Sequence, residues 1–235
     1  MAQDFVQQPY KVEQVASGFT SVEFADNPEP RCPCLLLLDT SGSMGGAPIS
    51  QLNAAIKVFK DELVADPLAA KRVEVAIITF GDAPHLEQDF VDVLTFQPQA
   101  FSASGTTAMG ASIEDGIRRL TERKDTYRQN GIAYYRPWVF LVTDGAPTDS
   151  WQRAAQDVRQ GEDNGAFSFF AVGVSDANFE VLNQIASPSR PAVKLDGLRF
   201  RDLFIWLSKS LKAVSKSTRG TQVQLDAPGW TTAVS

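Results

Sequence analysis

Residues 35–45 read LLLLDTSGSMG, an apolar run that ends abruptly in a carboxylate, two alternate hydroxyls and a glycine-rich turn. This pattern predicts a buried β-strand that carries polar side chains to the edge of a sheet. The oxygens of Asp39, Ser41 and Ser43 can converge on one point, because these residues are two positions apart. Hard oxygen ligands of this kind suit Mg²⁺, and the single carboxylate leaves coordination positions for water or an outside ligand.

The composition is that of an ordinary globular protein. The chain has 235 residues, of which 43% are hydrophobic and 21% charged, so it can bury one sizeable core. Its formal net charge of -6 argues against a surface for nucleic acid, which needs clustered Lys and Arg. No window approaches the roughly 18 apolar residues of a membrane span, and the polar N-terminus does not resemble a secretory signal. We therefore expect a cytoplasmic protein, with neither nucleic acid nor a membrane as its partner.

Apolar runs and amphipathic segments alternate along the rest of the chain. Continuous apolar runs predict buried strands, whereas alternation of apolar and polar residues predicts a less buried edge strand. The predicted strands are 35–38, 73–80, 90–96 at the edge, 136–143, 167–174 and 192–195, with a further short strand over 20–24. The predicted helices are 48–65, one that follows the loop 102–110, one that Asp149 caps and that runs to Glu162, 179–186 and 199–216.

Strands that alternate with helices in this way predict an α/β fold. The expected sheet is doubly wound, six-stranded and mostly parallel, with one antiparallel edge strand and helices on both faces. We expect an N-terminal extension over 1–31, one domain over 32–217 and a C-terminal tail over 218–235. Ligands of such folds bind beyond the carboxyl ends of the strands, at the topological switch point. A second apolar run ends in Asp144, so Asp39 and Asp144 both fall where this rule places a site.

Three loops together resemble the metal-ion-dependent adhesion site of von Willebrand factor type A domains. They carry Asp39-x-Ser41-x-Ser43, a threonine within 105–110, and Thr143-Asp144-Gly145. The resemblance covers residues 32–215. It implies the Rossmann-like fold of that family, and a binding module for another protein rather than an enzyme.

The resemblance also implies a role for each ligand. The two serines would coordinate the metal directly, whereas the two aspartates would act mainly through ordered water. The threonine would be a direct or conformationally switched ligand, and Thr107 fits the family's Thr-x-x-Gly pattern better than the alternative, Thr106. The cation would be Mg²⁺, with Mn²⁺ or Ca²⁺ as alternatives, and a carboxylate of a partner protein would complete its shell. The implied metal ligands are Asp39, Ser41, Ser43, Thr107 and Asp144.

Three longer segments resemble, more specifically, the TerY-like bacterial branch of this family, which is associated with tellurium resistance and stress response. They are residues 24–33, 143–149 and 198–208. Proteins of this branch are compact and cytoplasmic, in several cases alongside a protein kinase and a phosphatase. The resemblance therefore implies a kinase or a phosphatase of the same system as a partner.

The same residues are compatible with two alternative functions. An aspartate at the end of the first strand is also how haloacid-dehalogenase-like phosphatases begin, which would make the chain a Mg²⁺-dependent phosphoryl-transfer enzyme. Those enzymes need a second aspartate two residues later, where this chain has Ser41, and the sequence lacks a Gly-x-x-x-x-Gly-Lys-Ser/Thr phosphate loop. Alternatively, the domain is structural and its metal site vestigial, with Asp39 as a cap and the serines as turn residues.

The remaining reactive residues have simpler interpretations. We expect Cys32 and Cys34 to be reduced and packed near the start of a strand, because a metal or redox role needs further ligands or a Cys-x-x-Cys pair. The single histidine, His85, is expected in a solvated loop, and Arg123 on the solvated face of its helix. Trp151 is either exposed for a partner or buried as a packing residue.

Overall fold

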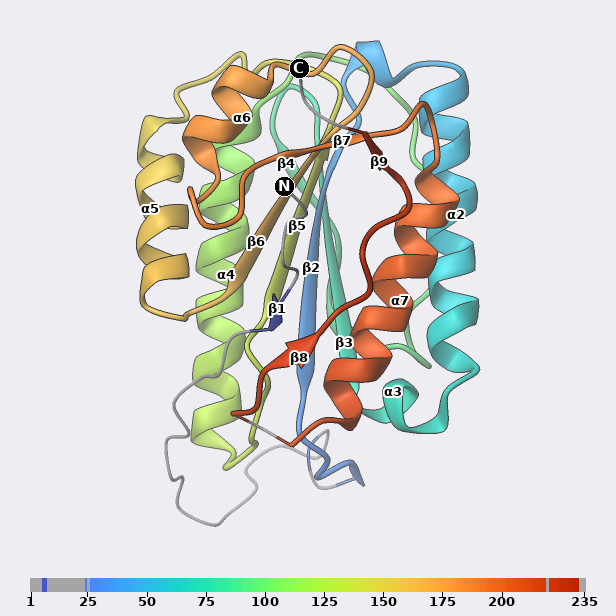
Figure 1. Cartoon of the computed structure of the whole chain (residues 1–235), viewed down its shortest axis with the longest axis vertical. Helices are drawn as coiled ribbons and strands as arrows, with labels where there is room; N and C mark the ends of the chain where they lie inside the picture. Colours follow the sequence, from blue (N-terminus) through green and yellow to red (C-terminus); the bar gives the residue numbers. More distant parts are fainter. Residues whose placement is uncertain (1–5, 8–23, 25, 219, 233–235) are drawn as a thin grey trace.

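The computed structural model describes residues 6–7, 24, 26–218 and 220–232. They form three layers, in which helices cover both faces of a central sheet (Figure 1). The strands are β1 (Val6–Gln7), β2 (Cys32–Asp39), β3 (Val73–Phe80), β4 (Pro84–Asp92), β5 (Trp138–Thr143), β6 (Ser168–Gly173), β7 (Val193–Leu195), β8 (Val223–Gln224) and β9 (Thr231–Thr232). The helices are α2 (Ala47–Val64), α3 (Pro67–Arg72), α4 (Met109–Gln129), α5 (Gln152–Asp163), α6 (Phe179–Ile185), α7 (Phe200–Lys216) and the short 3-10 helix η1 (Gly42–Met44).

Strand β2 is an interior strand of the sheet, and all eight of its residues are buried. Its side chains alternate between the two helical layers. Leu36 and Leu38 lie in the core beneath α2 and α7, whereas Leu35 and Leu37 lie in the core beneath α4 and α5. The continuous apolar run therefore reflects burial on both faces, as expected of an interior parallel strand.

The strand order of the sheet is β4-β3-β2-β5-β6-β7-β9, and only the two edge pairings are antiparallel. After β2, the chain adds β3 and then β4 on one side of it. It then returns and adds β5, β6 and β7 in turn on the other side. The switch point thus lies between β2 and β5, whose carboxyl ends are at the upper edge of the sheet in Figure 1. The predicted doubly wound α/β fold is confirmed, and a ligand site is expected at this edge.

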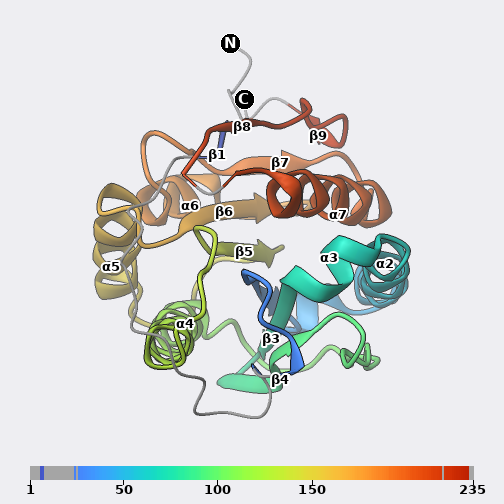
Figure 2. The same ribbon diagram turned by 90° about the horizontal axis from the view of Figure 1, so that it is seen from below.

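The helices form two layers, one on each face of the sheet (Figure 2). One contains α2, α3 and α7, and the other contains α4, α5 and α6. The rings of Phe59 in α2 and Phe204 in α7 pack edge to face, with centroids 5.5 Å apart.

Among the described residues, no helix is long and apolar enough to span a membrane.

Both edges of the sheet differ from the prediction. Seven strands are present rather than six, because β9 from the tail pairs antiparallel with β7. The other edge strand, β4, spans Pro84–Asp92 and not 90–96. It follows β3 after only three residues and pairs antiparallel with it, so the short turn and not the later alternation decides where this strand begins.

The structure contains one short helix that was not predicted, and one predicted strand falls almost wholly outside the described residues. Helix α3 follows α2 almost directly, because the Asp66 side chain accepts hydrogen bonds from the amides of Leu68 and Ala69 and so caps a new helix. The strand predicted over 20–24 lies outside the described residues except for Phe24, which is helical.

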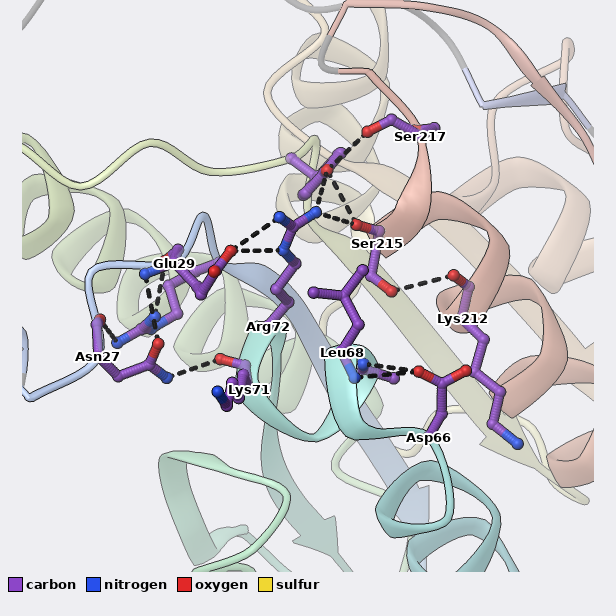
Figure 3. Close-up of polar contacts among 12 residues, drawn as sticks. Asn27, Glu29, Asp66, Leu68, Lys71, Arg72, Lys212, Ser215 and Ser217 are labelled. Atoms are coloured by element: carbon purple, nitrogen blue, oxygen red, sulfur yellow. Dashed lines mark hydrogen bonds and ion pairs between the residues drawn. The ribbon is translucent and has the colours of Figure 1, made fainter.

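Polar contacts at the lower end of the molecule tie three segments together (Figure 3). Arg72, at the end of α3, forms a salt bridge of 2.7 Å with Glu29. It also donates a hydrogen bond of 2.5 Å to the main-chain carbonyl of Ser215 near the end of α7. Asn27 donates to the carbonyl of Lys71 at 2.8 Å. The segment before β2 and the end of α7 are therefore both anchored to α3, opposite the carboxyl edge of the sheet.

Candidate metal centre

Three loops meet at the carboxyl edge of the sheet beyond β2 and β5. The parallel register places Leu38 beside Val142, so the next residues on the two strands, Asp39 and Thr143, are neighbours. Thr143 Oγ1 donates a hydrogen bond of 2.5 Å to Asp39 Oδ2. The amide of Ser41 donates to Asp39 Oδ1 at 2.8 Å. Both carboxylate oxygens of Asp39 are thus fixed by the protein itself.

A chain of short oxygen contacts runs from Ser41 to Asp144. The hydroxyl oxygens of Ser41 and Ser43 are 3.0 Å apart. Ser43 Oγ donates to Asp144 Oδ1 at 2.6 Å. An octahedral Mg²⁺ shell with bonds of about 2.1 Å places neighbouring ligand oxygens about 3.0 Å apart. The spacing of the two serine oxygens therefore fits a small, hard cation.

The two candidate threonines face different groups. Thr107 is buried, and a Cβ atom on Gly145 would lie 3.3 Å from Thr107 Oγ1 and 3.9 Å from Asp39 Oδ2. The Thr107 hydroxyl and the Asp39 carboxylate therefore border the same small space. Thr106 is exposed, and its amide and hydroxyl both donate to Asp82 Oδ1, at 2.8 and 3.0 Å. The structure thus turns Thr106 away from the other candidate ligands.

The centre has a buried base and an open rim. Asp39 and Ser41 are buried, whereas Ser43 is exposed and Asp144 partly exposed. Burial raises the pKa of Asp39, and repulsion from Asp144 adds to this, although hydrogen bonds from Ser41 and Thr143 act in the opposite direction. Within the described part of the chain, neither carboxylate forms a salt bridge. A bound cation would therefore supply the positive charge that these two carboxylates lack.

The loop that carries Thr106 and Thr107 lies close to the ends of β2 and β3, because a glycine leaves room for it. A Cβ atom on Gly81 would come within 2.6 Å of the carbonyl oxygen of Ser104. The amide of Ser104 donates to the carbonyl of Thr40 at 2.7 Å, and that of Gly42 donates to the carbonyl of Gly105 at 3.0 Å. These main-chain contacts hold the threonine loop across the ends of both strands.

The oxygen donors distinguish this centre from a zinc site of the cysteine and histidine type. No group of three or more His, Cys, Asp or Glu side chains in the described residues could hold a metal ion. Hydroxyls and two carboxylates are instead the donors that Mg²⁺ and Ca²⁺ prefer. Cys32 and Cys34 are free and buried in β2, as predicted, and burial raises the pKa of the Cys32 thiol to about 12. His85 is exposed, as expected, but lies in β4 rather than in a loop.

Three polar residues next to the centre were not among the predicted site residues. Thr143 orients the carboxylate at the end of β2, and the Thr148 hydroxyl accepts a hydrogen bond of 3.1 Å from the amide of Thr107. Asp149 was predicted to cap α5, but this is wrong: it accepts hydrogen bonds from amides at the start of α4. Helix α5 instead begins after Trp151, which is half-buried and provides no side-chain cap. The partners of all three residues are distant in sequence, so local spacing gave no signal for them.

Comparisons with known proteins agree with the fold. A sequence model of the von Willebrand factor type A domain matches residues 35–201. A von Willebrand factor type A structure from Catenulispora acidiphila is 18% identical, with a TM-score of 0.61 over 90% of this chain and 52% of that one. The pilus adhesin SpaC from Lactobacillus rhamnosus GG is 14% identical, with a TM-score of 0.64 over 85% of this chain and 32% of the adhesin. Proximal thread matrix protein 1 from the mussel byssus, with a zinc-occupied MIDAS motif, is 18% identical, with a TM-score of 0.50 over 81% of this chain and 46% of that one.

This chain spans about half the length of the first of these structures and less of the other two. Identities this low show a shared fold alone. The family model, in contrast, matches most of the chain and includes the strand ends that carry Asp39 and Asp144. On this evidence the chain belongs to the von Willebrand factor type A domain family.

Proposed function

We propose that this domain binds a divalent cation and, through it, an acidic group of another protein. The observation that carries the proposal is the pair of carboxylates, Asp39 and Asp144, joined by serine hydroxyls and without a salt bridge in the described chain. Domains of this family generally mediate interactions between proteins. The mussel byssus protein, which shares the fold, has a zinc-occupied MIDAS motif. The proposed ligands are Asp39, Ser41, Ser43, Thr107 and Asp144.

In the proposed function, the buried residues of the centre would bind the cation, and the residues at its open rim would face the partner. Asp39, Ser41 and Thr107 are buried and would hold the cation from below. Ser43 and Asp144 lie at the open rim, where a partner can approach. The bound cation supplies electrostatic attraction for an incoming carboxylate, because two carboxylates and neutral hydroxyls leave it with positive character. Mg²⁺ is the preferred cation on the spacing of the serine oxygens, with Mn²⁺ and Ca²⁺ as alternatives.

Phosphoryl transfer has less support than binding. A nucleophilic aspartate must reach its substrate, but Asp39 is fully buried and both of its oxygens accept hydrogen bonds. Ser41 occupies the position where a phosphatase of that type needs its second aspartate. The proposed function is therefore not enzymatic, and a trapped acyl-phosphate on Asp39 would contradict it.

The proposal also includes a biological setting for the domain. The segments 24–33, 143–149 and 198–208 support the TerY-like branch, and with it a tellurium-resistance or stress-response system and a kinase or phosphatase partner. The free, buried cysteines support a cytoplasmic location, because thiols stay reduced in that compartment.

We place the domain at 32–217, beyond the end of the family match, because α7 packs along α2. Residues 1–31 and 218–235 are then its extensions.

The two threonines offer a matched test of the ligand set. Thr107→Val should weaken Mg²⁺ binding by at least about tenfold, since even residues that only support metal ligands contribute about 10–100-fold to affinity. Thr106→Val should leave affinity nearly unchanged, because that hydroxyl is bonded to Asp82. Titration calorimetry of both variants measures this difference. Equal losses in the two variants, or a loss only in Thr106→Val, would contradict the choice of Thr107.

Capture of a partner tests the function itself. The full chain would be immobilised and exposed to a lysate of its native host with Mg²⁺ or with EDTA, and the bound proteins identified by mass spectrometry. We expect partners that EDTA releases and that Ser41→Ala does not retain. A wild-type chain that binds no divalent cation would instead indicate a structural domain with a vestigial site.

A further inference from the structure

Thr148 joins the loop after β5 to the loop that carries Thr107. The amide of Thr107 donates to Thr148 Oγ1 at 3.1 Å, and the amide of Thr148 donates to the carbonyl of Thr107 at 2.9 Å. Two hydrogen bonds in opposite directions therefore fix the main chain of Thr107 against the segment that follows Asp144.

Asp149 extends the same contact into α4. Its Oδ1 accepts from the amide of Gly110 at 3.0 Å, and its Oδ2 accepts from the amide of Ala111 at 2.8 Å. The first amides of a helix have no partner within the helix, and a carboxylate at this end is also favoured by the helix dipole. The N-cap residue of α4, Ala108, has no side chain that could accept them. A carboxylate from another loop therefore serves as the cap of α4.

Gly110 permits this close approach. A Cβ atom at this position would come within 2.3 Å of the carbonyl oxygen of Ser150 and 2.9 Å of the Cα atom of Trp151. Any other residue would push the loop after β5 away from the start of α4. The glycine that ends the Thr-x-x-Gly pattern thus has a packing role between the two loops.

We propose that Thr148 and Asp149 form a clamp that positions Thr107 at the metal centre and couples this centre to the first turn of α4. The inference rests on the proposed metal-binding function and adds two positioning residues to it, because neither side chain is among the ligands. The capped amides follow Thr107 by three and four positions, so movement of this turn displaces the Thr107 hydroxyl. With the clamp in place, the threonine loop and the Asp144 loop act as one preorganised unit, and without it the threonine must be ordered during binding.

The experiment compares Asp149→Ala, Asp149→Asn and Thr148→Val with the full wild-type chain, using Mg²⁺ itself as the probe. Asp149→Ala should weaken Mg²⁺ binding in calorimetry by about 10–100-fold, as supporting residues of metal sites do. Asp149→Asn should recover part of the affinity, because its single carboxamide oxygen can accept from one of the two amides, as Asn does at helix N-caps. In the metal-free protein, amide hydrogen exchange at Gly110 and Ala111 should be faster in Asp149→Ala than in wild type. Thr148→Val, a milder change at an exposed side chain, should weaken binding several-fold and speed exchange at Thr107.

A matched control separates positioning from general loss of stability. Asp66→Ala removes a cap of the same kind from α3, at the opposite end of the molecule, and should leave Mg²⁺ affinity unchanged. Equal affinity loss in Asp149→Asn and Asp149→Ala would overturn the clamp, because it would show that the charge of Asp149 acts on the cation. Unchanged affinity and exchange in Asp149→Ala would overturn it as well. If wild type binds no Mg²⁺, the proposed function fails, while hydrogen exchange in the metal-free variants still tests whether the clamp orders the threonine loop.

Discussion

Asp39→Asn is expected to abolish Mg²⁺ binding while the domain stays folded. The carboxamide retains an oxygen for the amide of Ser41 and can still bond to the Thr143 hydroxyl, so the local hydrogen bonds survive. The substitution removes one of the two carboxylates that would hold the cation. It also removes the repulsion with Asp144 that, together with burial, raises the pKa of Asp39. The metal-free variant should therefore be as stable as the metal-free wild type, or more stable.

Thermal unfolding and titration calorimetry measure both parts of this prediction. Mg²⁺ at a hundred times its dissociation constant should stabilise wild type by about 2.7 kcal/mol, and should not shift the unfolding of Asp39→Asn. Asp82→Asn is the matched control, because this nearby carboxylate bonds to Thr106 and not to the proposed ligands. It should bind Mg²⁺ like wild type. A calorimetric affinity in Asp39→Asn equal to that of wild type would remove Asp39 from the ligand set.

The buried strands could be predicted because their own composition determines them. Strand β3 has the predicted bounds, since eight consecutive residues are buried on both faces. Strand β4 could not be placed in this way. Most of its side chains are only partly buried, so its apolar pattern is weak. Its position depends on the tight turn after Phe80 and on hydrogen bonds to β3, which are properties of the pair of strands.

The candidate site likewise has some features that the local sequence determines and others that depend on contacts between residues far apart in the chain. The approach of Asp39 and Asp144 follows from two runs that end at the same edge of a parallel sheet, although their role as ligands stays a prediction. The roles of Asp149 and Arg123 were not predictable, because each depends on a partner distant in the chain. Asp149 bonds an amide 39 residues away, and Arg123 bonds Glu74, 49 residues away, instead of lying on the solvated face of α4.

Glu74→Ala is expected to cause the largest loss of stability. Glu74 is 1% exposed near the start of β3, and its carboxylate accepts hydrogen bonds from Arg31 at 2.8 Å, from Arg123 at 2.9 Å and from the Tyr127 hydroxyl. Its removal takes the Glu74 carboxylate away from two guanidinium groups, and one of them, Arg31, is itself buried. Breaking a buried ion pair in this way costs about 3–5 kcal/mol. Urea unfolding measures the loss as a change in the free energy of unfolding.

Two further variants show whether this loss comes from the buried charge. Glu74→Gln keeps the shape and an oxygen acceptor but removes the charge, so its loss should be smaller than that of Glu74→Ala. Glu122→Ala breaks an exposed ion pair on α4 and should change stability little, because water screens such pairs. Since Glu74 lies at the amino end of β3, away from the candidate metal centre, the Mg²⁺ affinity of folded Glu74→Ala should equal that of wild type. A loss no greater than that of Glu122→Ala would mean that the buried carboxylate does not stabilise the two arginines, and that the Phe24 ring, which both guanidinium groups contact, is held by packing alone.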